Sequence, residues 1–271
     1  MRRVVMAVVV AAGVAGVWGP AFGAGVPRSP FGFAVFGLGD VKVRDRVRAI
    51  DGAVGSNDGT TTVGKDVRVS DAVVGRTIRL RNGAMPGSLF CLLLESGATG
   101  LACQAVGLPV FDGTLLPSVQ VSPGSTAINI PPRGRTSPIP AGNYGKLNIR
   151  SGGLLRLAGG SYTFRSINVG PRAQLLCTAA CDIGVAGAVR TQDRSTLAGE
   201  GGTPAGQVRL NIASERRNRA AFSGGKRATI SAVVYAPKGR IELRDGGNFV
   251  GSYVGATVSV GRDAIVQQRG P

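Results

Sequence analysis

The stretch GKLNIRSGGLLRL (Gly145 to Leu157) repeats twenty residues later as RSINVGPRAQLLC (Arg165 to Cys177). In both copies apolar residues alternate with other residues, a turn of three to five residues follows, and apolar residues then resume. Such alternation is typical of a short β-strand that turns one face inward. Glycine beside these strands permits the left-handed backbone that a sharp corner needs. The stretch therefore predicts short strands joined by tight corners.

Further copies of this pattern occur along the chain. A second shift of twenty places Val189 under Val169 and Leu197 under Cys177. Looser copies lie at Thr77 to Ala84, Gly239 to Phe249 and Ala256 to Val266. A repeat of this length is typical of one coil of a parallel β-solenoid. We therefore predict an all-β fold, a right-handed parallel β-helix with coils of about 17–20 residues. An antiparallel sandwich or jelly roll is the alternative, but hairpins need no constant period.

The repeat is looser between about residues 89 and 140. This part of the chain is rich in proline and carries Cys91 and Cys103. Strand-like units on its two sides look alike, which favours one continuous domain. We expect a single β-helix domain over residues 25–271, with a disulfide-bearing insertion around 89–140.

The chain begins with the layout of a secretory signal peptide. Arg2 and Arg3 precede an apolar stretch from Val4 to Trp18, and small residues follow. An uncleaved anchor is the alternative, although the apolar run is short and interrupted by glycine for a membrane-spanning helix. We expect residues 1–24 to be a signal peptide and the mature chain, without a membrane span, to be secreted or held in the cell envelope.

The chain has four cysteines, an even number that suits disulfides in an oxidising compartment. Three connectivities are possible, and we expect the local one, in which Cys91 pairs with Cys103 and Cys177 with Cys181. The C-x3-C spacing of the second pair has no matching pair that would complete a metal site. Each bridge would hold a loop that buries little apolar surface by itself.

Several features of the sequence argue against an enzyme. Histidine is absent, which excludes Ser-His-Asp and Cys-His mechanisms and histidine-ligated metals. Glycoside hydrolysis needs two carboxylates close together, yet no two acidic residues are adjacent or separated by one residue. The nearest pairs, Asp66 with Asp71 and Glu242 with Asp245, suit turns. We therefore expect no catalytic residue, no cofactor and no metal.

The net charge of +17, from 32 Lys and Arg against 15 Asp and Glu, favours attraction of polyanions. Charges scattered over a solvated surface are the alternative. Arginines within three successive coils are our candidate polyanion contacts: Arg150, Arg156, Arg165, Arg172, Arg190 and Arg194. Arg150 and Arg190 lie two periods apart, with Gly170 between them, so we expect a partial ladder.

Three stretches resemble a group of secreted bacterial β-helical proteins. PIPAGNYGKLNIRSGGLLRLAGGSYTFRSINV (Pro138 to Val169) is similar to one of their coils, and VVYAPKGRIELRDGGNFVGSYVGATVSVGRDAIV (Val233 to Val266) is similar to their ending. The opening FAVFGLGDVKVRDRVRAIDGAVGSNDG (Phe33 to Gly59) resembles their first coil. The group includes exported surface proteins of the choice-of-anchor-A and polymer-forming types. Bacterial ice-binding β-helix proteins are a weaker resemblance, because this sequence lacks the long amphipathic helix that accompanies their β-helix.

Together these observations predict a non-catalytic, exported structural or surface protein that contacts acidic polysaccharide or another acidic envelope polymer. An ice- or surface-binding protein is one alternative, but it needs ranks of Thr and Ala where Lys146, Arg156 and Glu242 are expected to point outward. A polysaccharide-active β-helix enzyme is the second alternative. Export argues against a specific nucleic-acid partner, and the sequence leaves the oligomeric state open.

Overall fold

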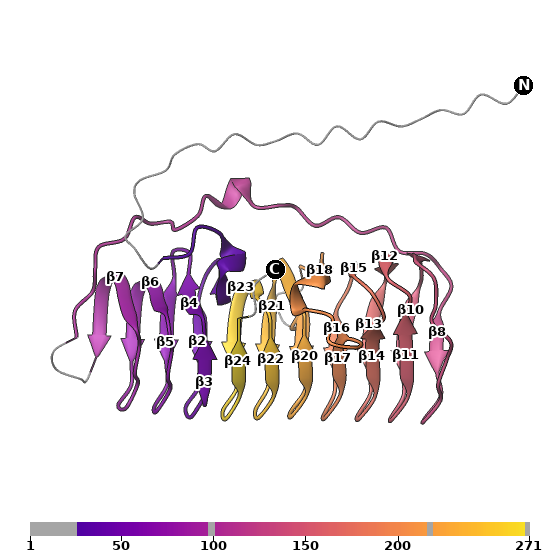
Figure 1. Ribbon diagram of the computed structural model, residues 1–271. Helices are drawn as coiled ribbons and strands as arrows, with labels where there is room; N and C mark the ends of the chain where they lie inside the picture. Colours follow the sequence, from indigo (N-terminus) through magenta and orange to yellow (C-terminus); the bar gives the residue numbers. More distant parts are fainter. Residues whose placement is uncertain (1–25, 97–100, 216–218, 269–271) are drawn as a thin grey trace, which may run out of the picture.

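The computed structural model describes residues 26–96, 101–215 and 219–268, so the expected signal peptide over residues 1–24 lies outside the described residues. Parallel strands stack into a β-solenoid of about eleven coils (Figure 1). The predicted parallel β-solenoid is therefore confirmed. Leu147 pairs in parallel with Ile167, and Leu155 pairs with Leu175, at the predicted shift of twenty residues. Helix is limited, in the described chain, to the 3-10 turns η1 (Pro30–Gly32), η2 (Gly113–Leu115) and η3 (Ala205–Gln207).

Each coil has up to three strands, and the stacked strands form three faces. Face 1 contains β1 (Phe33–Gly37), β4 (Ala53–Ser56), β9 (Gly142–Asn143), β12 (Gly160–Phe164), β15 (Cys181–Val185) and β18 (Val208–Ile212). Face 2 contains β2 (Val41–Val43), β5 (Thr60–Val63), β8 (Ile128–Ile130), β10 (Lys146–Ile149), β13 (Ser166–Val169), β16 (Val189–Thr191) and β19 (Phe222–Gly224). Face 3 contains β3 (Ala49–Asp51), β11 (Leu154–Leu157), β14 (Gln174–Cys177), β17 (Thr196–Gly199), β20 (Thr229–Ser231), β22 (Asn248–Val250) and β24 (Ile265–Gln267).

Four long strands bend around the corner between faces 1 and 2. They are β6 (Ala72–Leu80), β7 (Ser88–Ser96), β21 (Val233–Leu243) and β23 (Tyr253–Val260). Because these strands belong to both faces, faces 1 and 2 form one 17-stranded sheet, and face 3 is a separate 7-stranded sheet. The inward residues of all three faces meet in one apolar core that runs along the solenoid.

The coils do not stack in chain order. The N-terminal coils run from β1 towards β7, and the C-terminal coils run from β8 back to β24. The two blocks meet inside the solenoid, where β1 and β2 pair with β23, and β3 pairs with β24. The first and last coils are therefore neighbours, and β7 and β8 form the two ends of the stack (Figure 1).

The chain between β7 and β8 returns along the outside of face 1, and we call residues 105–127 the strap (Figure 1). The Tyr235 hydroxyl donates to the carbonyl oxygen of Pro117 at 2.8 Å. Further along, the Thr163 hydroxyl donates to the carbonyl oxygen of Ser122 at 3.1 Å. The region expected as an insertion thus has two parts: residues 88–96 and 128–130 are solenoid strands, whereas the strap lies outside them.

A second apolar cluster lies between the strap and face 1. Its buried members include Phe33, Phe36, Phe90, Val110 and Tyr235. For this reason β1 and β4 are buried along their whole length, instead of showing the alternation seen on faces 2 and 3. The strap therefore occupies the outer side of face 1 and leaves faces 2 and 3 accessible.

One coil is longer than the repeat predicts. Gly160 pairs with Cys181, and Ile167 pairs with Val189, so the shift grows from twenty to 22 residues. The expected match of Val189 with Val169 is therefore wrong, and Val169 pairs with Thr191. The first additional residue lies at the corner between faces 3 and 1, where corners tolerate extra residues because they do not enter the strand ladder.

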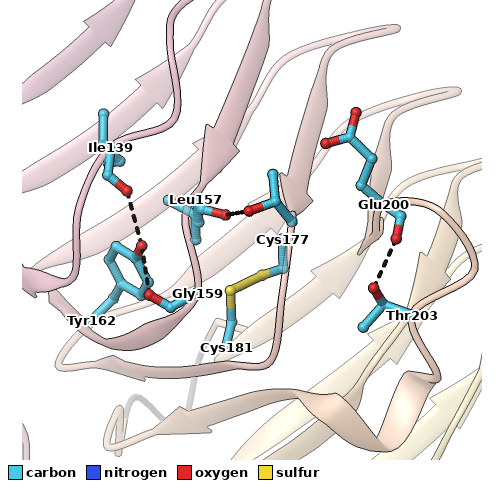
Figure 2. Close-up of a disulfide and its surroundings, with 9 residues drawn as sticks. Ile139, Leu157, Gly159, Tyr162, Cys177, Cys181, Glu200 and Thr203 are labelled. Atoms are coloured by element: carbon cyan, nitrogen blue, oxygen red, sulfur yellow. Dashed lines mark hydrogen bonds between the residues drawn. A yellow bond between two sulfur atoms is a disulfide. The ribbon is translucent and has the colours of Figure 1, made fainter.

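Both expected cysteine pairs lie at disulfide distance. The Cα atoms of Cys91 and Cys103 are 5.4 Å apart, and those of Cys177 and Cys181 are 6.1 Å apart. Cys177–Cys181 closes the lengthened corner, beside the Tyr162 hydroxyl, which lies near the carbonyl oxygens of two other residues (Figure 2). Cys91–Cys103 joins the terminal strand β7 to the start of the chain segment that becomes the strap.

We predict that Asn57 holds the strap on the solenoid. This buried side chain donates to the carbonyl oxygen of Phe111 at 2.9 Å and accepts from its backbone N–H at 2.7 Å. Asn57→Ala leaves both groups without this partner, so the free energy of unfolding should fall by about 1–3 kcal/mol in chemical denaturation. The exposed Asn129 is the control, and Asn129→Ala should change it by less than about 0.5 kcal/mol. Equal effects of the two substitutions would contradict this role.

Candidate functional site

The corner between faces 2 and 3 has the same backbone conformation in successive coils. One residue of each turn has a positive φ, between 54° and 75°. We call these positions the corner row. In the order of the stack, from the β6 end to the β8 end, they are Gly83, Asp66, Arg46, Asp263, Gly246, Arg227, Arg194, Arg172, Gly152 and Arg133.

A ladder of backbone hydrogen bonds explains this conformation. The N–H of Arg172 donates to the carbonyl oxygen of Asp193 in the next coil at 3.0 Å, and the N–H of Arg194 donates to that of Lys226 at 2.9 Å. The N–H of Gly246 donates in the same way to Arg262 at 2.8 Å. A left-handed turn aims this N–H along the solenoid axis, so the corner continues the hydrogen bonding of the sheets.

Arginine is an unexpected residue type for this conformation. Positive φ favours Gly, Asn and Asp, because a Cβ atom approaches the following carbonyl oxygen. Gly83, Gly152 and Gly246 make the same turn, so the fold does not require a long side chain there. Backbone strain of this kind is concentrated at functional sites. The five arginines of the corner row are therefore the strongest candidate for a binding feature.

Four of the five arginines are available to a ligand. Arg133, Arg172, Arg194 and Arg227 are exposed, and no ion pair is seen for them within the described part of the chain. Arg46 is different, because its Nε lies 3.3 Å from Oδ1 of Asp263 in the neighbouring coil. The free part of the row is thus in the C-terminal block of coils.

The ion pair also affects the ionisation of Arg46. The hydrogen bond to Asp263 raises the pKa of the Arg46 guanidinium above its usual value. In the same turn the pKa of Asp45 is lowered, mainly because its carboxylate accepts the backbone N–H of Lys65 at 3.0 Å. Arginine stays protonated in proteins, so this corner keeps its charge across the ordinary pH range.

Two grooves border the free arginines. A groove of about 930 Å³ follows the corner itself, and a second of about 810 Å³ lies beside it on face 2. The corner groove has five cationic residues in its lining: Arg48, Arg172, Arg194, Lys226 and Arg227. Three carboxylates also line it: Asp193, Asp245 and Asp263. The lining is therefore net positive but contains both donors and acceptors.

Two of these carboxylates also stabilise the corner. Oδ1 of Asp193 accepts the backbone N–H of Lys226 at 3.3 Å, and Oδ1 of Asp245 accepts that of Arg262 at 2.9 Å. Each carboxylate thus bonds to the next coil through one oxygen and leaves the other oxygen towards the groove. The acidic residues here have a structural task, as the sequence indicated for acidic residues at turns.

The structure divides the six predicted arginines among different surfaces. Arg172 and Arg194 belong to the corner row, and Arg190 lines the groove on face 2. Arg150 precedes the row position Gly152. The other two lie elsewhere: Arg156 is on face 3, where its Nε contacts Oε1 of Glu200 at 2.9 Å, and Arg165 lies between β12 and β13.

The expected register of Arg150 with Arg190 is wrong. Arg190 pairs with Asn168, and Asn168 pairs with Asn148, so the row of Arg190 continues to Asn148 rather than to Arg150. The cause is again the 22-residue coil, which shifts all later positions by two. That same coil brings Arg172 and Arg194, 22 residues apart, into one row.

Sequence reasoning missed Arg46, Arg133 and Arg227. Each of the five row arginines comes one residue before a Val, Gly, Ala or Ser, as in DRV, PRG, PRA, DRS and KRA. Most of these following residues are buried, because the chain turns back into the core directly after the left-handed residue. An arginine before a small or apolar residue in each turn was the available signal, and variable coil length concealed it.

Other kinds of site find little support. Within the described ranges there is no group of three or more Cys, Asp or Glu residues that could hold a metal ion. The same residues include no helix long and apolar enough to cross a membrane. Comparisons with protein-family models, curated proteins and solved structures give no match.

We predict that the row arginines lower stability. Arg194→Gly should raise the free energy of unfolding by about 0.5–1 kcal/mol, because glycine adopts the left-handed turn without Cβ strain. Arg190 is the matched control, since it lies in β16 of the same coil. Arg190→Gly should lower stability by about 0.5–1 kcal/mol, the usual effect of glycine within a strand. Thermal and chemical denaturation measure both, and destabilisation by Arg194→Gly would contradict a strained position.

Proposed function

We propose that the protein is a non-catalytic, extracytoplasmic β-solenoid that binds an acidic polymer of the cell envelope along its corner row. One observation carries this proposal: arginine occupies five left-handed positions at which glycine makes the same turn. A stability cost repeated in five coils calls for a gain elsewhere, and a straight row of guanidinium groups offers one. Guanidinium groups bind carboxylate and phosphate with two parallel hydrogen bonds.

The location of the protein supports the choice of partner. Two cysteine pairs at disulfide distance are typical of proteins outside the cytoplasm. The N-terminal sequence has the layout of an export signal. The net charge of +17 draws anionic polymers to the surface before specific contacts form. A bacterial envelope offers such polymers, and a rigid solenoid offers a long straight surface to hold them.

The proposal of a non-catalytic role rests on the residues of the corner. The sequence has no histidine, and Asp193 and Asp245 already accept backbone N–H groups. Neither carboxylate is thus arranged as a free general acid. Lyase and reducing-sugar assays on acidic glycans test this part of the proposal, and measurable turnover would overturn it.

Binding to heparin as a model polyanion should depend on the row arginines. The triple variant Arg172→Gly, Arg194→Gly and Arg227→Gly should bind at least about tenfold more weakly at low salt. Its salt dependence should also fall by about one unit of slope per lost contact, because fewer counterions are released. Affinity measured over a range of salt concentrations provides both numbers.

A control with the same loss of charge separates the row from the net charge. Arg28, Arg165 and Arg209 are absent from the linings of the grooves at the corner and on face 2. Replacing these three by Gln removes the same charge from other surfaces and should change the affinity by less than about threefold, the effect expected of distant screened charges. Equal losses in the two triple variants would show that net charge alone attracts the polymer.

A second candidate function has its own observation on face 3. Outward residues there form two uncharged rows on three neighbouring coils, Thr196, Thr229 and Asn248 in one and Ala198, Ser231 and Val250 in the other. Of the charged outward residues expected from the sequence, Lys146 and Glu242 lie on face 2 strands instead. A flat uncharged array suits an ice or crystal surface, and a thermal-hysteresis assay tests it. Ice shaping that is lost in Thr229→Arg, with polyanion binding intact, would favour this candidate.

A further inference from the structure

The free part of the corner row forms one continuous cationic line parallel to the solenoid axis. Arg172, Arg194 and Arg227 lie on three consecutive coils, and the strand spacing separates neighbours by about 4.8 Å. Glycines occupy the next position at each end of this run, but arginine stems cover them. A Cβ atom added to Gly152 or Gly246 would meet the Cγ of Arg133 or Arg227, respectively, at 3.5 Å.

The line has a defined length. It begins at Arg133, near the β8 end of the stack, and continues to Gly246. The next position is Asp263, which is paired with Arg46, so the row changes sign there. Six coils separate a free cationic stretch from this ion pair, and five strand spacings make the stretch about 24 Å long. A ligand that follows it must be a linear polymer.

The groove beside the line is not purely cationic, and this limits the chemistry of the polymer. Asp193 directly precedes Arg194, and Asp245 directly precedes Gly246, so carboxylates alternate with the cationic positions. A polyphosphate chain has acceptor oxygens alone, and these carboxylates would repel it. A sugar chain with carboxylate groups brings anions for the arginines and hydroxyl donors for the free oxygens of Asp193 and Asp245.

We infer that the ligand of the corner row is a linear polyuronic acid that lies parallel to the solenoid axis. This inference rests on the proposed function and names its polymer class. One sugar ring has nearly the length of one strand spacing, so a chain with one carboxylate per ring presents one anion to each coil. About six rings cover the free stretch from Arg133 to Gly246.

Chain length provides the first test. Homopolyuronate oligomers of three, six and twelve rings are titrated at low salt, with a neutral oligosaccharide of six rings as the control. The hexamer should bind at least about tenfold more tightly than the trimer, because two to three more anion–arginine contacts form. The dodecamer should add no more than the about twofold statistical gain of overlapping positions, and the neutral chain should not bind. Affinity that keeps rising steeply from six to twelve rings would overturn the defined length.

The two aspartates provide the second and sharper test. Asp193→Asn with Asp245→Asn keeps an oxygen for the backbone N–H groups but replaces each charged acceptor. This double variant should bind the uronate hexamer about three- to tenfold more weakly, because hydrogen bonds to charged acceptors are the stronger ones. It should bind inorganic polyphosphate of equal charge more tightly, because two repelling charges are gone. Opposite changes for the two polymers are the signature of sugar hydroxyls on these carboxylates.

The outcomes separate this inference from the function on which it rests. Tighter binding of both polymers by the double variant, or wild-type preference for polyphosphate, would overturn the polyuronate and leave a polyanion site. Loss of salt-dependent binding to every polyanion, in a wild-type protein that folds normally, would overturn the proposed function itself. Thermal denaturation of the double variant establishes that the corner turns persist.

Discussion

The parallel ladder between the first and the last coil is the contact on which the architecture depends. β1 and β2 pair with the two halves of β23, and β3 pairs with β24, so the N-terminal block of coils completes its sheets on strands made last. This closure places the ends of the solenoid at β7 and β8, in the middle of the chain. The chain must then travel from one end to the other, and the strap that does so covers face 1 with a second apolar layer. Two faces and the corner between them remain for recognition.

The same axial hydrogen bonding imposes the left-handed corner. Each turn between faces 2 and 3 must point one N–H towards the neighbouring coil, and a positive φ achieves this. Any side chain at that position projects from the outermost edge of the solenoid, at the spacing of the strands. A backbone requirement thus becomes a ruler for side chains. Arginine at five positions and glycine at three show that the backbone tolerates both, so the choice of arginine reflects what the edge meets rather than what the turn needs.

Charge on this protein is therefore organised at some positions and dispersed at others. Arg46 and Arg156 are engaged by Asp263 and Glu200 and add little to the field that a ligand meets. Arg133, Arg172, Arg194 and Arg227 share one edge, and Asp193 and Asp245 lie between them as caps of the corner. The acidic residues reduce the net charge of the groove, and in exchange they give it hydrogen-bond acceptors. A mixed lining of this kind selects polymers by more than their charge density.

The sequence by itself determined the coil: the alternation in Gly145 to Leu157 and its copy in Arg165 to Cys177 specify strands, corners and parallel pairing, because burial of one strand face is a local demand. It also determined the two cysteine pairs, since both loops are short. The order of the coils was decided by tertiary structure alone, because β1 could stack on any matching coil and the fit of β23 chose one. The corner row was likewise hidden in the sequence. Arg172, Arg194 and Arg227 are 22 and 33 residues apart, and no constant period relates them. Hydrogen bonds between coils fix the strands and let the corners vary in length, so residues at irregular intervals in the chain come to lie in one straight row.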